Sequence, residues 1–212
     1  MFKLCTDIRR KSLEELVTVL SQKLAMDDVT FEGHKTKQRY GLDDLGLNQF
    51  SRRYIAHMLA RITAYVEAQS GQPDLFPNYV DRQAHNACDI EHIWPNDFQR
   101  FQAEFADQAE FQRFRNHIAS LLLLPADVNR SLQDKSFEEK AHHYARQNLF
   151  AASLTSPTYQ HQPKFKGFRE KHGLPFKPYD QFSKAEQLER RQLLEQLVNL
   201  IWSPERLKEA AA

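Results

Sequence analysis

Apolar residues recur at helical spacing in several stretches of the chain, and each stretch predicts an amphipathic helix. Three of them begin with a serine that is followed three positions later by a glutamate, at Ser12, Ser136 and Ser183. In this capping box the serine oxygen accepts a hydrogen bond from the third helical amide, and the glutamate accepts one from the serine amide. Leucine and aromatic residues follow each serine at intervals of three and four positions. We therefore predict that helices start at these three serines.

Two further stretches have a helical pattern. Residues 51–68 place Ile55, Leu59 and Ile62 on one face. Residues 97–118 are also periodic, but the phase breaks between Phe105 and Phe111, so two short helices fit as well as one long helix. Residues 27–48 and 70–86 are rich in Gly, Asp, Asn and Pro, which favours loops.

Only two stretches predict strands. Residues 88–94 alternate between polar and apolar and stop at Pro95, and residues 120–124 form a short apolar run that stops at Pro125. A run this short and this apolar is typical of a buried strand. The pattern as a whole predicts a mainly α fold, a helical domain with one small two-stranded element near its middle.

Composition limits the classes of protein that remain. The 212 residues contain 41% hydrophobic residues, enough for a core, and only two cysteines, which exclude a disulfide framework and a four-cysteine zinc site. No segment has the length and apolarity of a membrane span, and none resembles a signal peptide. We therefore expect a soluble, cytoplasmic protein. The net charge of +1 is low for a dedicated nucleic-acid-binding domain, so any DNA contact needs local patches or another domain or subunit.

The two predicted strands frame a group of residues with catalytic chemistry. Glu91 and His92 are adjacent near the end of the first strand, and Asn129 follows the second. A strand, a turn, a second strand and a helix would bring them together in a ββα unit. Neutral imidazole accepts a proton from water, and carboxylate and amide oxygens are ligands for Mg²⁺ or Mn²⁺. Residue types alone leave structural roles open: a buried histidine, a surface carboxylate paired with arginine, and a helix-capping asparagine.

A family resemblance favours the catalytic interpretation. Residues 89–95 read Asp-Ile-Glu-His-Ile-Trp-Pro and resemble the Asp/Glu-His-Ile-x-Pro strand of HNH (His-Me finger) nucleases. The closest likeness is to the C-terminal nuclease domain of GmrSD-type, modification-dependent restriction endonucleases. The leucine run that ends at Pro125, then Asn129, and then the pair Lys135 and Lys140 around Phe137 follow that family's order. The likeness covers roughly residues 50–202.

The resemblance implies a mechanism. His92 matches the general base, and Glu91 and Asn129 match the ligands of one Mg²⁺ or Mn²⁺ ion in an embedded ββα-metal motif. The family's asparagine at the start of the second strand is Ser120 here, so Ser120, or nearby Asn116, would support the site instead. The implied function is a DNA endonuclease in the restriction of phage or other foreign DNA. An NTP-hydrolysing sensor domain is expected in the same full-length chain or in a partner subunit.

Several further expectations complete the prediction. Lys135 is a candidate phosphate contact, and Lys164, Lys166 and Lys171 lie in a segment that interleaves basic and aromatic residues. That segment suits DNA binding with base stacking, or equally a solvated loop with its aromatic rings turned inward. We divide the chain into an N-terminal helical segment or linker (1–50), a nuclease domain (51–202) and a tail (203–212), for which a vector-derived origin stays open.

Two other functions stay open from the sequence. The first is a non-catalytic DNA-binding or assembly module with a degenerate nuclease fold, which the near-neutral charge and Ser120 favour. The second is a zinc hydrolase, which would need a further nitrogen or sulfur ligand near His92, and only His85 and Cys88 are close in sequence.

Overall fold

The computed structural model describes residues 6–27, 41–160 and 162–209 of the chain. Within this part the fold is mainly helical, as predicted, with a single two-stranded sheet. The sheet consists of β1 (Cys88–His92) and β2 (Leu121–Pro125). The helices are α2 (Leu13–Asp27), α3 (Arg52–Gln69), α4 (Phe76–Val80), α5 (Gln108–Asn116), α6 (Ala126–Leu132), α7 (Phe137–Tyr144), α8 (Leu149–Ala152), α9 (Pro163–His172), α10 (Lys184–Trp202) and α11 (Pro204–Glu209), with 3₁₀ turns η1 (Leu42–Asp44), η2 (Phe98–Phe101), η3 (Ile118–Ser120) and η4 (Ser156–Tyr159).

The serine-glutamate signatures start helices where the sequence predicts them. Ser12 and Glu15 exchange two hydrogen bonds of 2.9 and 3.2 Å at the start of α2. Ser136 and Ser183 form complete capping boxes at the starts of α7 and α10. The helix expected over residues 51–68 is α3, and the periodic stretch over residues 97–118 is divided into η2 and α5. These predictions hold because capping and periodicity are local properties of the chain.

Helices lie in several stretches where none was expected, and α4 and α6 are two of them. The loop prediction for residues 70–86 is wrong over α4, where the Phe76 ring packs against His57 at 5.1 Å and lies under the Arg61 guanidinium at 3.6 Å. Contacts with α3, rather than the pattern of α4 itself, therefore stabilise this short helix. The second is α6, which begins directly after β2 and holds only two apolar positions at helical spacing, Val128 and Leu132. Of the first expected loop, residues 28–40 lie outside the described residues.

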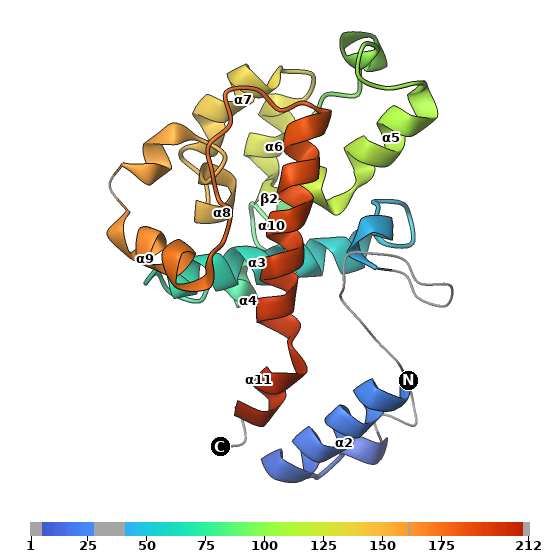
Figure 1. Cartoon of the computed structure of the whole chain (residues 1–212), viewed down its shortest axis with the longest axis vertical. Helices are drawn as coiled ribbons and strands as arrows, with labels where there is room; N and C mark the ends of the chain where they lie inside the picture. The colour runs from blue at the N-terminus through green and yellow to red at the C-terminus, as the bar shows by residue number, and fades with distance from the viewer. Residues whose placement is uncertain (1–5, 28–40, 161, 210–212) are drawn as a thin grey trace.

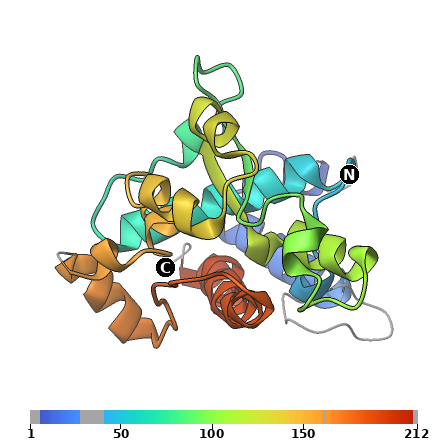
Figure 2. The same ribbon diagram turned by 90° about the horizontal axis from the view of Figure 1, so that it is seen from above.

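The core surrounds the hairpin formed by β1 and β2. Helix α3 contacts β2 on one side and α10 on the other. Figure 1 shows α10 crossing in front of α3, and Figure 2 shows α3 running between α6 and α10. The leucines of β2 are buried, as predicted. Trp94 is also buried, within a cage of aromatic rings formed by Phe101, Phe105, Phe111 and Phe182. This cage fixes the chain two residues after His92.

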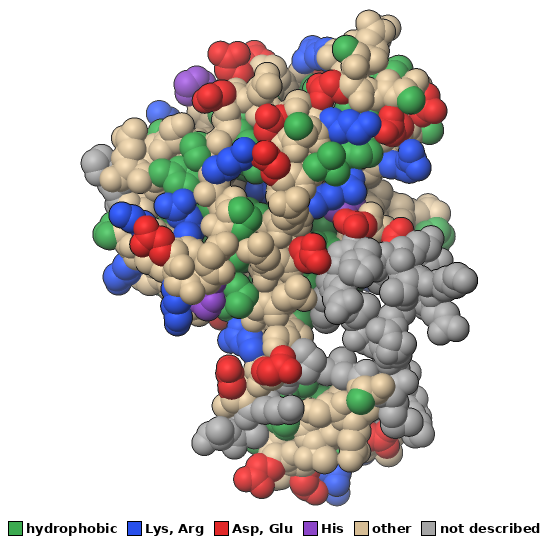
Figure 3. Space-filling model, in the orientation of Figure 1, with side chains coloured by type: hydrophobic (Ala, Val, Ile, Leu, Met, Phe, Trp, Pro, Cys, Tyr) green, Lys and Arg blue, Asp and Glu red, His purple; other side chains and the backbone are tan. Residues whose placement is uncertain are grey.

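The two ends of the described chain meet, because α2 contacts α11 (Figure 1). The domain boundaries at residues 50 and 202 stay predictions, and the expected vector residues 210–212 lie outside the described part. None of the described helices combines the length and apolarity that crossing a membrane requires. On the face seen in Figure 3, basic and acidic side chains are interspersed rather than separated, in keeping with the near-neutral charge.

Candidate active site

The pairing of β1 with β2 brings α6 next to the end of β1. Strands β1 and β2 pair antiparallel, with His92 opposite Leu121 and Glu91 opposite Leu122. Helix α6 follows β2 immediately and contacts both strands. Its Asn129 donates a hydrogen bond from Nδ2 to the carbonyl of Ile90 at 3.0 Å, which links the helix to β1. The interpretation of Asn129 as a helix cap is wrong, because it is the fourth residue of α6 and Pro125 occupies the cap.

One cavity of about 290 Å³ is lined by all three residues that the sequence singles out, Glu91, His92 and Asn129. The other lining residues are Asn96, Arg115, Arg130, Gln133, Asp134 and Lys140. Gln133 ends α6 with a φ of 27°, in the left-handed region that residues with side chains avoid. Such strain is concentrated at functional sites. The fold therefore brings Asn129 into the same cavity as the adjacent pair Glu91 and His92, from which it is far apart in sequence.

His92 is held by Asn116, which lies at the end of α5. Its Nε2 is 3.0 Å from Oδ1 of Asn116, and the amide oxygen accepts, so Nε2 carries the hydrogen. The other ring nitrogen, Nδ1, has no hydrogen bond to a described residue. Burial, together with the nearby positive charge of Arg115, lowers the pKa of His92 to about 4. The imidazole is therefore neutral at pH 7, the form that can accept a proton.

Glu91 is buried and paired with a buried lysine. Its Oε1 accepts hydrogen bonds from Lys140 Nζ at 2.7 Å and from the Tyr144 hydroxyl at 3.0 Å. Lys140 Nζ also donates to the His92 carbonyl at 2.7 Å, so one ammonium group ties both neighbouring residues together. Burial raises the pKa of Glu91 and lowers that of Lys140, while each charge opposes the shift of the other. The alternative of a surface carboxylate paired with arginine is wrong.

Ser120 and Asn116 both lie at the base of the hairpin. Ser120 is fully buried, and its hydroxyl donates to the Phe114 carbonyl at 2.7 Å. Its own carbonyl accepts a hydrogen bond from the Ile93 amide at 2.9 Å. Asn116 is the residue that contacts the imidazole directly. Ser120 thus connects the end of α5 to the backbone beside His92, while Asn116 orients the ring.

The cavity offers oxygen ligands for a divalent cation. Because Asn129 uses its Nδ2 in the bond to Ile90, its Oδ1 is the atom left for a cation, and the Glu91 carboxylate lines the same cavity. Carboxylate and amide oxygens are the ligands that Mg²⁺ and Mn²⁺ prefer, so the donor set fits such an ion. Among the described residues no group of three or more His, Cys, Asp or Glu side chains has the arrangement of a metal site.

Two residues of the site were not assigned a role from the sequence. Lys140 lies on the buried face of α7, three positions after Phe137 and four before Tyr144, and a lysine on such a face is a sign of a buried partner. Arg115 donates from Nε to the carbonyls of Trp94 and Pro95 at 3.2 and 3.3 Å. Sequence spacing could not identify Lys140 or Arg115 as part of the site, because each lies on a different element from the residues that it contacts.

The lysines predicted to bind DNA do not line the cavity. Lys135 precedes α7 and follows Asp134, which does line it. Lys164, Lys166 and Lys171 lie on α9, whose Phe168 contacts Tyr65 near the far end of α3. Tyr65 lies 13 positions after Arg52 on α3, so its contact with Phe168 is roughly 20 Å along the helix from Arg52. Phe165 and Phe168 are buried, so the inward alternative holds for these rings and base stacking on them is excluded.

Four other histidines of the described part have structural or solvent-exposed positions. His117 is buried rather than exposed: its Nε2 lies 3.1 Å from the Leu42 carbonyl, and its Nδ1 accepts from the Ala119 amide at 3.0 Å. Burial lowers its pKa to about 3. His142 and His143 are exposed on α7, and His85 is exposed before β1.

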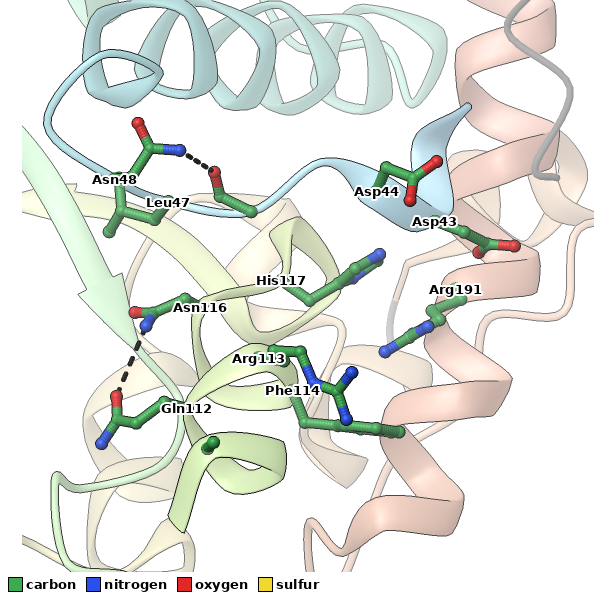
Figure 4. Close-up of a pocket in the computed structure, with 12 residues that line it drawn as sticks. Asp43, Asp44, Leu47, Asn48, Gln112, Arg113, Phe114, Asn116, His117 and Arg191 are labelled. Atoms are coloured by element: carbon green, nitrogen blue, oxygen red, sulfur yellow. Dashed lines mark hydrogen bonds between the residues drawn. The ribbon is translucent and has the colours of Figure 1, made fainter. Parts of the chain in front are cut away.

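A larger cavity of about 680 Å³ lies on the other side of Asn116 (Figure 4). It is lined by the segment before α3, by α5 and by Arg191 of α10. In Figure 4, Gln112 and Asn116 are joined by a hydrogen bond, and Arg113 and Arg191 extend toward the same space. Carboxylates of Asp43 and Asp44 line it as well, so its charges are mixed.

A comparison with known protein families shows to which family the chain belongs. Residues 35–194 match the family model described as GmrSD restriction endonucleases, C-terminal domain. The chain belongs to this family. The match covers most of the chain and confirms the resemblance that the strand motif suggested. Membership in the GmrSD C-terminal domain family implies a nuclease role related to restriction, with DNA as the substrate. No curated protein and no solved structure matches the chain significantly.

Proposed function

We propose that this GmrSD C-terminal domain is a metal-dependent DNA endonuclease of the HNH type, acting in the restriction of foreign or phage DNA. The observation that carries the proposal is the shared cavity, in which a neutral imidazole lies beside a carboxylate and an amide oxygen. In this proposal β1, β2 and α6 together form the ββα-metal motif.

His92 acts as the general base. Its Nε2–H is fixed by Asn116, so Nδ1 is the nitrogen that accepts a proton from water as the water attacks the phosphorus. Glu91 and Asn129 hold one Mg²⁺ or Mn²⁺ ion. When bound, the ion supplies positive charge to the phosphate and to the leaving oxygen. Arg115 and Arg130 also line the cavity and suit an anionic phosphate.

Lys140 is a positioning residue in this proposal. Its ammonium donates to Glu91 Oε1 and to the His92 carbonyl, so it fixes the carboxylate and the backbone of the base at the same time. The ammonium also offsets the negative charge of Glu91. A buried carboxylate without such a partner is energetically unfavourable.

The experiment is nicking of supercoiled plasmid by the chain in Mg²⁺ or Mn²⁺, beside His92→Ala and the matched control His142→Ala. His142 is an exposed histidine on α7 that does not line the cavity. We expect nicking by the wild type and by His142→Ala, and a loss of at least about 100-fold in His92→Ala. Equal background from all three proteins, with DNA binding retained, would instead support a non-catalytic DNA-binding module.

A further inference from the structure

A third cavity, of about 530 Å³, lies at the opposite end of the hairpin from His92. It is formed by the first turns of α3, the end of α4 and the start of β1, with Cys88 and Leu123 at its base. Figure 1 shows α4 lying beside α3, as their contacts also indicate. Its walls carry Arg52, Arg53, Arg82 and His57, and no Asp or Glu is among the described residues that line it.

We call the cavity lined by Arg52, Arg53 and Arg82 the arginine pocket. Most of its positive charge is not neutralised by other described residues. Arg52 forms an ion pair with Asp89 of β1 at 2.6 Å. Arg53 and Arg82 are exposed and form no hydrogen bond or ion pair with a described residue. Two guanidinium groups therefore face a common space without a compensating carboxylate. A polyanion with spaced phosphates matches such a surface, because guanidinium donors pair with phosphate oxygens.

The arginine pocket lies close enough to the cavity of His92 for one DNA strand to contact both. Cys88 and His92 are the first and last residues of β1, so the two cavities are separated by about 13 Å along the strand. Successive nucleotides of a DNA strand advance about 3.4 Å along the duplex axis. The strand also winds around this axis, so a strand whose phosphate lies at His92 presents another phosphate at the pocket within a few nucleotides.

We infer that the arginine pocket binds the DNA backbone within a few nucleotides of the phosphate at His92, with Arg53 and Arg82 as its main phosphate contacts. The inference rests on the proposed nuclease function, and it assigns DNA binding to a different surface from the lysines of α9. The contacts are to phosphates, so they position the duplex without reading its sequence.

The test is the salt dependence of binding to a short fluorescent DNA duplex, with EDTA present so that no cleavage occurs. The double variant Arg53→Ala/Arg82→Ala is compared with Arg9→Ala/Arg146→Ala, which removes the same charge from exposed arginines that line neither cavity. Each phosphate contact contributes about 0.9 to the slope of log K against log salt. We expect the first variant to reduce the slope by about 1.8 and the control to leave it unchanged.

The outcomes separate this inference from the proposed function. An unchanged slope in Arg53→Ala/Arg82→Ala, or an equal change in both variants, would overturn the inference even if the wild type nicks plasmid. A selective change in slope supports the inference even if the wild type and His92→Ala show the same background nicking, in which case only the nuclease proposal fails. Circular dichroism of both variants verifies that the fold is retained.

Discussion

Two cations are buried among the described residues, Lys140 and Arg190, and their surroundings differ. The Lys140 ammonium donates to a carboxylate and to a carbonyl at the end of β1. The Arg190 guanidinium is fully buried on α10, donates once from Nε to the Ala119 carbonyl, and has Nη1 and Nη2 without a hydrogen-bond partner. It lies 4.5 Å from the centre of the Phe150 ring, whose face attracts a cation.

The difference indicates which cation serves the site. Lys140 is paired with a charge, so removal of either partner leaves the other buried and uncompensated. Arg190 has no carboxylate partner, and burial lowers its pKa to about 10. Its role is to hold the chain before Ser120 through one carbonyl. We conclude that the charge of Lys140 belongs to the candidate active site and that the guanidinium of Arg190 belongs to the scaffold.

The substitution Lys140→Met should have the largest effect on stability. It leaves the buried Glu91 carboxylate without its ammonium, which costs about 3–5 kcal/mol of unfolding free energy. Urea denaturation followed by circular dichroism measures it. The double variant Glu91→Gln/Lys140→Met should recover part of that loss, because no buried charge then remains. A single variant as stable as the wild type would show that the pair is not buried as described.

Stability should also fall as the pH is lowered from about 6.5 toward 4. His92 and His117 have folded-state pKa values of about 4 and about 3, below the ordinary value of 6.5, so the unfolded chain binds more protons in this range. Each pH unit corresponds to about 1.4 kcal/mol per histidine. His117→Gln should reduce the slope of unfolding free energy against pH by about one proton, and His142→Ala should not change it. Equal slopes in all three proteins would contradict the assigned burial.

Arg190→Met should have a smaller effect than Lys140→Met. The apolar side chain removes two buried groups that lack partners, and it sacrifices one hydrogen bond to a carbonyl, so the net cost is about 0–1.5 kcal/mol. The same urea measurement applies. If Arg190→Met destabilised the protein as much as Lys140→Met does, the guanidinium would have to interact with a charge, and the contrast between the two cations would be lost.

Much of the fold was predictable because its signals are local. The three capping boxes, the periodic face of α3 and the two short strands all depend on neighbouring residues. Helix α6 was missed because its seven residues hold only two apolar positions, and its contacts with the hairpin, rather than its own pattern, stabilise it. The aromatic rings of α9 could not be oriented from sequence, since basic and aromatic residues interleave on either kind of surface.

The candidate site was predictable only in part. The strand motif pointed to Glu91 and His92, and the family order pointed to Asn129. The partners of these residues come from other elements: Asn116 from α5, and Lys140 and Tyr144 from α7. Periodicity shows that Lys140 faces inward, but the carboxylate it meets lies 49 positions away in sequence. Such pairings are properties of the tertiary fold, and spacing along the chain does not contain them.

The central claim is that one cavity holds both the base and the ligands of a divalent ion, and binding of Mn²⁺ measured beside plasmid nicking tests it most directly. Electron paramagnetic resonance of free Mn²⁺ gives the binding constant for the wild type, His92→Ala and Asn129→Leu. We predict that His92→Ala binds Mn²⁺ like the wild type but does not nick, whereas Asn129→Leu loses at least about tenfold in Mn²⁺ affinity and also fails to nick. Wild-type binding and nicking by Asn129→Leu would contradict the account.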